Sequence, residues 1–211
     1  MTTHQSKALL DGNQANQAEA VQKILVVDDS DVILRLVKHA LEREGYDVWT
    51  AVSGEEALRM VEKHGVPHLA IVDINMPPGM DGFELCRRLH TFCDVPIIML
   101  SAEQEEATVA QGLDRYAEDY IVKPDDGPLR IVELTSRVGR VLRRMGTFGY
   151  ALSPTINVDA RLQVSFAKRH IFVHGREISL TPTETKILYV LMRHAGRTVA
   201  TDFLLQRVWP L

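Results

Sequence analysis

The sequence predicts a doubly wound α/β fold over residues 23–145 and a smaller α+β unit over residues 156–211. Two observations favour the first part. Five short apolar runs alternate with segments of helical periodicity, and runs such as "VPIIML" lack the apolar–polar alternation of a half-exposed strand. Strands that are buried on both faces and joined through helices form parallel sheets. We therefore expect five parallel strands with helices on both sides.

The first strand–helix unit sets the pattern for the other four. "KILVVDD" predicts a strand that ends at acidic residues, and "DVILRLVKHALEREG" predicts a helix with one apolar face that stops at Gly45. The same succession recurs in "DVWTAV" and "SGEEALRMVEKHG", "HLAIVDI" and "DGFELCRRLHTF", "VPIIML" and "EEATVAQGLDRY", and "DYIVKP" and "LRIVELTSRVGRVLRRM".

The second unit follows "GTFGYALSPT" at residues 146–155, which has the composition of a linker. Turn signals at Asp159-Ala160, Ala167-Lys168 and His174-Gly175 divide the next stretch into short hairpin strands. The first of two helices has Thr181 as its N-cap, Pro182 at its first position and Glu184 closing a capping box, and the second is capped by Thr201 or Asp202. Strands followed by two helices are the first part of a winged helix-turn-helix.

Composition and charge narrow the class of protein. With 45% hydrophobic and 25% charged residues the chain is typical of globular proteins, and no apolar run approaches the roughly 18 residues of a membrane helix. Residues 1–22 lack the features of a signal peptide, so we expect a disordered leader and a cytoplasmic protein. Residues 23–144 carry 22 acidic and 15 basic residues, whereas residues 145–211 carry 4 acidic and 8 basic residues. Only the second unit is expected to meet a polyanion.

Polar residues stand where the predicted strands end. Asp28 and Asp29 end the first strand, Asp73 the third, Ser101 the fourth and Lys123 the fifth. Because the carboxyl ends of parallel strands share one edge of the sheet, we expect these side chains to converge. Crowded carboxylates repel one another unless a cation neutralises them, and an all-oxygen donor set suits Mg²⁺.

Lys123 and Ser101 then remain to bind an anion, for which a phosphoryl group is the simplest candidate. No glycine-rich loop follows the first strand, so we expect the phosphoryl group to be attached covalently to a carboxylate, without a bound nucleotide. Each residue alone has an ordinary structural interpretation, since an Asp after a strand usually caps a helix and a Lys-Pro usually forms a turn. The prediction depends on their placement at one edge.

Four segments, "ILVVDDS", "AIVDINMPPGMDGFEL", "PIIMLSA" and "DYIVKP", resemble the receiver domain of two-component response regulators. "LTPTETKILYVLMRHAGRTVATDFLLQRVW" resembles the effector domain of the OmpR/PhoB family. The resemblance extends from Lys23 onward and implies a flavodoxin-like receiver joined to a winged-helix DNA-binding domain. In the family a recognition helix and a wing follow the last helix of this sequence, so the resemblance implies a truncated domain over residues 156–211. It implies a phosphoprotein that regulates transcription, with a sensor histidine kinase as phosphoryl donor and DNA as partner. Such a protein transfers a phosphoryl group to itself and is not an enzyme with turnover.

The resemblance also implies a role for each site residue. Asp73 is the expected phosphoacceptor, Asp29 a direct Mg²⁺ ligand and Asp28 a ligand acting mainly through water. Asp73 and the backbone carbonyl of Asn75 are also expected to bind Mg²⁺. Ser101, Ala102 and Lys123 are expected to contact the phosphoryl group, and Ser101 and Tyr120 to act as the switch. Asn75 and Glu103 are expected to tune dephosphorylation. The pair at positions 75 and 103 is similar to that of fast-relaxing chemotaxis regulators, so we expect a short-lived phosphoaspartate.

Two regions depart from the family pattern. "MPPGMDG" is one residue longer than the usual loop, and Asp125 replaces the Phe that commonly follows Lys-Pro. Family members dimerise through a face with charged side chains, and here the corresponding positions are occupied by Ala107, Val109 and Arg115. The expected dimer face keeps only Glu118, Asp119, Glu133 and Arg137. A phosphorylation-dependent homodimer is therefore expected to use an incomplete set of ion pairs.

Two other functions remain open from the sequence. One is a receiver-based interaction or phosphorelay module that does not itself bind DNA, because the recognition helix is missing. The other is a phosphatase with an aspartyl nucleophile, to which "VVDDSD" bears a faint likeness and in which Asp28 would be the nucleophile.

Overall fold

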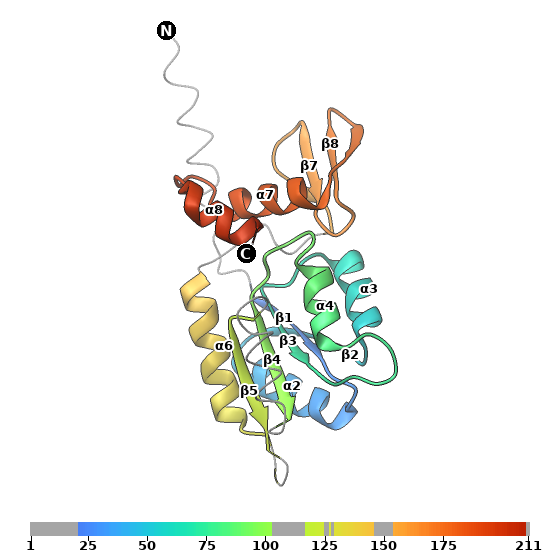
Figure 1. The fold of residues 1–211 in the computed structure, drawn as a ribbon, viewed down its shortest axis with the longest axis vertical. Coiled ribbons are helices and arrows are strands. Elements are labelled where there is room, and N and C mark those ends of the chain that lie inside the picture. Colours follow the sequence, from blue (N-terminus) through green and yellow to red (C-terminus); the bar gives the residue numbers. More distant parts are fainter. Residues whose placement is uncertain (1–20, 103–116, 125–126, 128, 146–153, 210–211) are drawn as a thin grey trace.

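A computed structural model of the chain describes residues 21–102, 117–124, 127, 129–145 and 154–209. Its first unit contains a five-stranded sheet in the order β2-β1-β3-β4-β5, seen in the lower half of Figure 1. The strands are β1 (Lys23–Val27), β2 (Asp47–Ala51), β3 (Leu69–Asp73), β4 (Ile97–Ala102) and β5 (Asp119–Lys123). Every pairing in this sheet is parallel, which confirms the predicted doubly wound α/β class.

Helices cover both faces of the sheet. They are α2 (Asp31–Arg43), α3 (Gly54–His64), α4 (Gly82–Leu89) and α6 (Ile131–Met145). Within β1, Leu25 and Val27 pack in the cluster that includes α3 and α4, whereas Ile24 and Val26 pack in the cluster that includes α2 and α6. Both faces of the strand are therefore buried, which explains its continuous apolar run. The helix predicted in "EEATVAQGLDRY" lies outside the described residues.

Local signals in the sequence set the starts of the helices on one face. Ser53 caps α3 by accepting a hydrogen bond from the backbone N–H of Glu56 at 3.2 Å, and Asp81 caps α4 through Glu84 N–H at 2.7 Å. On the other face, Ser30 occupies the N-cap of α2 without a side-chain cap bond, and its N–H donates to Asp28 Oδ1 at 2.9 Å. This bond fixes the acidic residue at the end of β1 to the start of the next helix.

The second unit is a four-stranded antiparallel sheet followed by two helices. Its elements are β6 (Ile156–Asn157), β7 (Leu162–Ser165), β8 (His170–Val173), β9 (Arg176–Ser179), α7 (Pro182–Arg193) and α8 (Thr201–Val208). The strands follow one another in the order β6-β7-β8-β9, and the three predicted turns separate them. The small α+β unit typical of the start of a winged-helix domain is thus confirmed.

Of the two helix caps predicted in this unit, one is present and the other is not. The capping box of Thr181 and Glu184 is present, with Pro182 at the start of α7. The predicted cap of α8 was wrong, because the N-cap is Ala200 and makes no side-chain hydrogen bond. Thr201 and Asp202 already lie inside the helix, which begins one residue earlier than its polar residues suggest.

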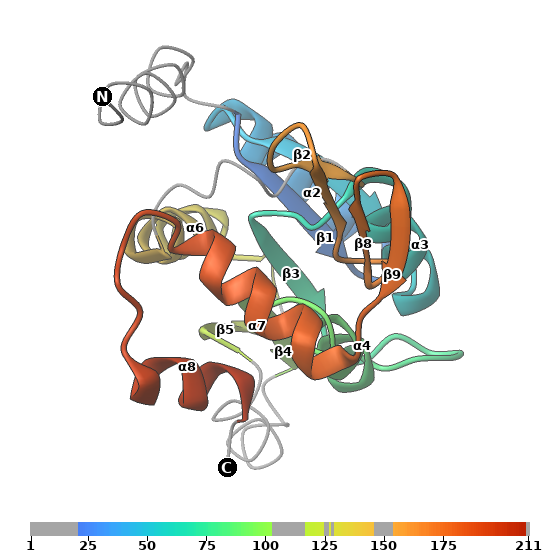
Figure 2. The same cartoon turned by 90° about the horizontal axis from the view of Figure 1, so that it is seen from above.

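The two units pack against each other at the edge of the parallel sheet where its strands begin. Figures 1 and 2 show α7 and α8 across this edge, at the opposite end of the sheet from the carboxyl ends of its strands. Phe166 and Tyr189 of the second unit share an apolar cluster with Cys93 and Val95 of the first. Residues 1–20 of the expected leader and 146–153 of the expected linker lie outside the described residues. Among the helices that are described, none is both long and apolar enough to cross a membrane.

Candidate functional site

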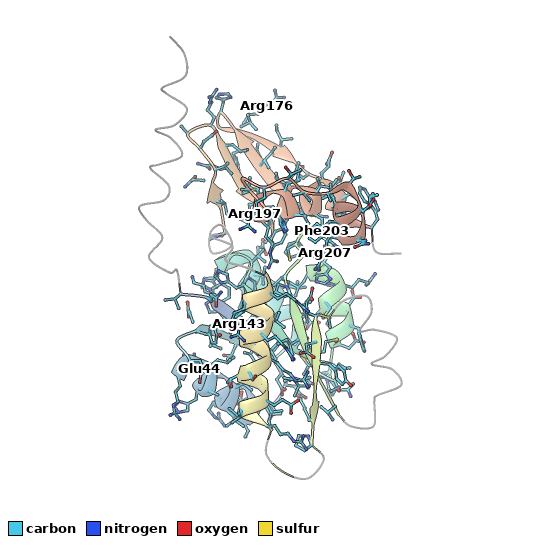
Figure 3. The ribbon with its side chains drawn as sticks, turned by 90° about the vertical axis from the view of Figure 1, so that its left-hand side faces the viewer. Glu44, Arg143, Arg176, Arg197, Phe203 and Arg207 are labelled. Atoms are coloured by element: carbon cyan, nitrogen blue, oxygen red, sulfur yellow. The ribbon has the colours of Figure 1, made fainter. Side chains whose placement is uncertain are left out.

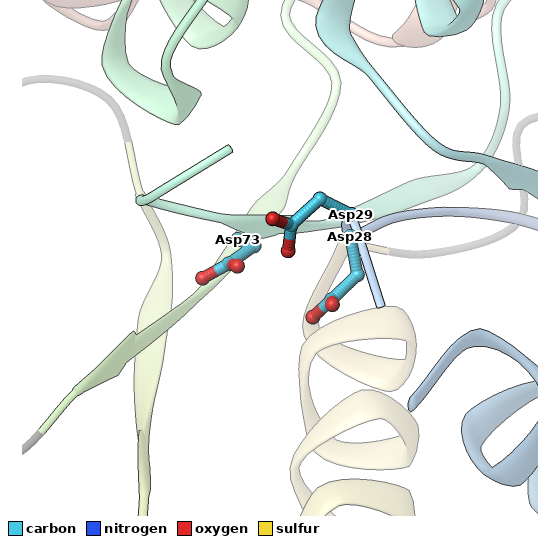
Figure 4. Close-up of side chains that lie close together, drawn as sticks. All are labelled: Asp28, Asp29 and Asp73. Carbon is cyan, nitrogen blue, oxygen red and sulfur yellow. The ribbon is translucent and has the colours of Figure 1, made fainter. Parts of the chain in front are cut away.

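Three acidic side chains meet at the carboxyl edge of the parallel sheet. Asp28 and Asp29 follow β1, and Asp73 is the last residue of the neighbouring strand β3. Figure 4 shows them converging, and each offers a carboxylate oxygen within 4.8 Å of the others. Asp28 and Asp73 are buried and Asp29 is exposed, so the cluster has a buried base and an open side. The convergence expected from the strand ends is present for these three residues.

Lys123, at the end of β5, joins two of these carboxylates. Its Nζ lies 2.8 Å from Asp28 Oδ2 and 2.8 Å from Asp73 Oδ2. Burial raises the pKa of Asp73 to about 6, although the hydrogen bond and charge of Lys123 act to lower it. Burial also acts to lower the pKa of Lys123, but its hydrogen bonds to the two carboxylates outweigh this and raise that pKa. The ammonium therefore stays charged between the acids.

Strand register places Ser101 and Ala102 of β4 beside the strand ends that carry this pair. Ser101 follows Leu100, the β4 partner of Asp73, and is 2% exposed. Ala102 is the β4 partner of Lys123. The backbone of Asn75 donates a hydrogen bond to the Asp73 carboxylate, which acts to lower its pKa. Glu103 lies outside the described residues, so its predicted role stays a prediction.

The loop after Asp73 is held close to the site by two contacts that the sequence did not indicate. Gly82 donates its N–H to Ile74 O at 2.9 Å, and a Cβ at this position would lie 2.2 Å from the carbonyl oxygen of Asp73. Glu55 of α3 accepts a hydrogen bond from Met80 N–H at 3.2 Å. The "DG" pair at the start of α4 was a usable signal, because glycine is required where two backbones approach this closely.

Tyr120, the predicted switch residue, is 37% exposed on β5. It borders a surface pocket lined also by Val122, Pro124, Arg130, Glu133 and Arg137. Its side chain is therefore accessible from outside, whereas that of Ser101 is buried.

The predicted dimer-face residues form ion pairs within the chain. Arg137 binds Asp119 at 2.6 Å and Glu133 at 2.6 Å. Arg144 of α6 pairs with Glu118. All four retained charged positions are thus engaged along β5 and α6, while Ala107, Val109 and Arg115 lie outside the described residues.

The donor set fits a hard divalent cation. Lys123 contacts two of the three carboxylates, the oxygens of all three lie within 4.8 Å of one another, and the exposed Asp29 leaves access from solvent. Oxygen ligands of this kind suit ions such as Mg²⁺ or Ca²⁺. Asp28, Asp29 and Asp73 could therefore hold a metal ion.

Comparisons with known proteins agree with this geometry. Residues 24–134 match the family model described as "Response regulator receiver domain", and residues 175–211 match "Transcriptional regulatory protein, C terminal". The chain is 35% identical to the transcriptional regulatory protein AfsQ1 of Streptomyces coelicolor, covering 88% of this chain and 78% of that protein. It is 38% identical to the transcriptional regulatory protein ResD of Bacillus subtilis, covering 89% of this chain and 77% of that protein.

A solved structure extends the similarity over both units. The response regulator DrrB, a Thermotoga maritima OmpR/PhoB homologue, is 27% identical, with a TM-score of 0.52 over 90% of this chain and 81% of that one. The receiver match, the partial match of the C-terminal domain and the acidic cluster at the sheet edge all agree. The chain belongs to the OmpR/PhoB-type response regulators, phosphoacceptor proteins with a receiver domain and a transcriptional regulatory domain.

Proposed function

We propose that Asp73 accepts a phosphoryl group from a histidine of a sensor kinase, with Mg²⁺ bound by the acidic cluster, and that this modification controls the DNA-binding unit. One observation carries the proposal: the Asp73 carboxylate lies in a three-carboxylate cluster and 2.8 Å from Lys123. A nucleophilic carboxylate beside a fixed cation and a metal-binding donor set is the arrangement that phosphoryl transfer to a side chain requires.

The transfer forms one bond and breaks one. A carboxylate oxygen of Asp73 attacks the phosphorus, the oxygen–phosphorus bond forms, and the phosphorus–nitrogen bond to the kinase histidine breaks with its electron pair left on the imidazole. A pKa of about 6 leaves the Asp73 carboxylate mostly ionised at neutral pH, as a nucleophile must be. Lys123 neutralises a phosphoryl oxygen, and the Ser101 hydroxyl donates a hydrogen bond to another.

Bound Mg²⁺ would supply charge neutralisation of the phosphoryl oxygens. Asp28, Asp29 and Asp73 would hold it, together with the backbone carbonyl of Asn75. The family resemblance also assigns a phosphoryl contact to the backbone of Ala102 and dephosphorylation tuning to Asn75 and Glu103, which favours a short-lived phosphoaspartate.

The switch we propose uses Ser101 and Tyr120. A phosphoryl group on Asp73 draws the Ser101 hydroxyl toward it, and Tyr120 then moves inward from its exposed position. Because Tyr120 borders Glu133 and Arg137, this movement alters the face formed by β5 and α6. A phosphorylation-dependent homodimer would form through that face, with Glu118 and Asp119 exchanging partners between subunits.

The experiment that tests the phosphoacceptor is labelling with acetyl phosphate in the presence of Mg²⁺. The wild-type chain should take up one phosphoryl group that Asp73→Asn abolishes, as measured by intact mass. Asp47→Asn is the matched control, since Asp47 stands at the start of β2, on the opposite edge of the sheet, and should keep the label. A label that survives in Asp73→Asn but disappears in Asp28→Asn would contradict the proposal and favour an aspartyl phosphatase.

A further inference from the structure

The loop that joins Asp73 to α4 has two buried anchors and an exposed tip. Met76 and Met80 are 3% and 8% exposed, whereas the residues between them, 77–79, are all exposed. This loop is also one residue longer than the usual loop of the family. Each added residue increases the number of conformations that a loop can adopt, so a contact that selects one of them matters more here than in a shorter loop.

Glu55, in the first turn of α3, makes such a contact. Its Oε1 accepts a hydrogen bond from Met80 N–H at 3.2 Å, and a Cβ at Gly79 would lie 3.2 Å from the same oxygen. Gly79 has a φ of +120°, which favours glycine, so the tip brings bare backbone against the carboxylate. The Met80 side chain packs over Gly54, where a Cβ would lie 2.8 Å from its Sδ. The start of α3 therefore holds the loop through Gly54 and Glu55.

The Glu55 carboxylate is charged at neutral pH. Its own backbone N–H and that of Met80 donate hydrogen bonds that lower its pKa, which outweighs partial desolvation, and the charge of Arg88 on α4 acts in the same direction. Arg88 also donates to Glu84 Oε1 at 2.7 Å in the first turn of α4. The bond to Met80 N–H is thus charge-assisted, and bonds of this kind are about twice as strong as neutral ones.

The other end of the loop carries groups of the acidic site. The backbone of Asn75 donates a hydrogen bond to the Asp73 carboxylate, and Gly82 N–H closes the base of the loop on Ile74 O at 2.9 Å. Closed at its base by Gly82 and near its tip by Glu55, the loop has little freedom to turn the Asn75 carbonyl away from the site.

We propose that Glu55 is a positioning residue for the metal site, and that by holding Met80 it keeps the loop in the arrangement that presents the Asn75 carbonyl to Mg²⁺. The proposal rests on the Mg²⁺ site proposed above. Glu55 is not one of the proposed ligands and acts only through the loop. Its loss should therefore weaken Mg²⁺ binding without slowing phosphoryl transfer once the metal is bound.

The contact between the two units lies at the opposite edge of the sheet from this loop. There Arg207 of α8 donates a hydrogen bond to Glu118 Oε1 at 3.0 Å, and Figure 3 shows Arg207 where α8 faces the receiver. Glu55 follows β2 at the carboxyl edge, so its substitution tests the loop without removing this contact.

The test compares two substitutions of Glu55 in the full chain. Glu55→Ala removes both the acceptor oxygen and the charge, whereas Glu55→Gln removes the charge and keeps an acceptor oxygen. The matched control is Glu62→Ala, which removes one carboxylate from an exposed position of the same helix. Calorimetric titration measures Mg²⁺ affinity, nuclear magnetic resonance follows hydrogen exchange of the Met80 amide, and acetyl phosphate at saturating Mg²⁺ gives the rate of Asp73 labelling.

Glu55→Ala should raise the Mg²⁺ dissociation constant about tenfold, the usual scale for losing a group that orients a metal ligand. The Met80 amide should exchange about tenfold faster, because its acceptor is gone. Glu55→Gln should bind Mg²⁺ within about threefold of wild type, since a neutral acceptor keeps the loop in place. Glu62→Ala should match wild type in affinity and in exchange. All variants should label within about twofold of wild type at saturating Mg²⁺.

Equal weakening by Glu55→Ala and Glu55→Gln would overturn the proposal, because loss of negative charge near the cluster would then explain it. Slower labelling of Glu55→Ala at saturating Mg²⁺ would also overturn it, since Glu55 would then act on the transfer itself. Wild-type Mg²⁺ affinity in Glu55→Ala counts against the role of Glu55 alone. A wild-type chain that binds no Mg²⁺ would overturn the metal site, and the proposal with it.

Discussion

The Lys123 ammonium lies 2.8 Å from the Asp73 carboxylate, although β4 separates the two strands that carry them. It also reaches Asp28, a residue 95 positions away in the sequence. One flexible side chain thus spans the edge of the sheet and holds two buried carboxylates in place. The site is assembled by strand order, because no segment of the chain contains it alone.

Replacing this ammonium tests its part in phosphoryl transfer. Lys123→Met keeps the length of the side chain but removes its charge, so we expect the rate of labelling by acetyl phosphate to fall about 100-fold. Lys38→Met, which removes a cation from an exposed pair on α2, should label at the wild-type rate. Labelling of Lys123→Met within a few-fold of wild type would contradict a direct role for the ammonium.

Metal binding should stabilise the folded receiver, because only the folded chain brings the three carboxylates together. At a Mg²⁺ concentration about 100 times the dissociation constant, the free energy of unfolding should rise by about 2.7 kcal/mol. Asp29→Ala should lose most of this increase, as measured by thermal unfolding with and without Mg²⁺. Asp31→Ala, two residues further on, should keep it. An undiminished Mg²⁺ effect in Asp29→Ala would remove that residue from the ligand set.

Gly82 should tolerate no side chain. Because its Cβ would lie 2.2 Å from the backbone oxygen of Asp73, Gly82→Ala should lower the free energy of unfolding by about 1–3 kcal/mol and slow labelling of Asp73. Gly139→Ala is the matched control in α6, where the new methyl would meet the mobile end of Arg143 at 3.2 Å. That change should stabilise the helix by about 0.5–1 kcal/mol, as urea unfolding would show. Equal effects at both glycines would refute the close approach.

The two helix caps of the second unit should respond differently to the same substitution. Thr181→Ala removes the side chain that accepts Glu184 N–H at 3.3 Å, so the free energy of unfolding should fall by about 1 kcal/mol. Thr201→Ala should change it by less than about 0.5 kcal/mol, because the N-cap of α8 is Ala200. Chemical denaturation followed by circular dichroism compares them, and a larger loss in Thr201→Ala would restore Thr201 as a cap.

The acidic site could be predicted because its members stand at strand ends. Apolar runs fix where a strand stops, and parallel pairing brings those stops to one edge, so Asp28, Asp73 and Lys123 could be placed together from the sequence alone. The capping box at Thr181 was predictable for a similar reason, since its signal lies within four neighbouring residues.

Other features depend on contacts between segments that share no periodic pattern. The approach of Gly82 to Asp73 depends on how the loop folds back over β3, and the Arg207–Glu118 pair joins residues 89 positions apart across two units. The "DG" pair marks Gly82 as a glycine at a helix start but does not identify Asp73 as its neighbour, and Arg207 looks in the sequence like an ordinary surface arginine. The sequence likewise did not predict which arginines pair with the acidic residues of the expected dimer face.

Strand β5 has a contact at each end, and this has a consequence for how a signal can travel. Glu118, just before the strand, holds Arg207, whereas Lys123, its last residue, holds Asp73. Five residues of strand span about 17 Å, roughly two screening lengths in physiological salt. A charge added at Asp73 would therefore act on Arg207 only weakly through space, and a displacement of the strand would couple the two contacts more directly. The acidic cluster and the second unit are thereby separable: a different unit could replace the second one without altering Asp28, Asp29 or Asp73.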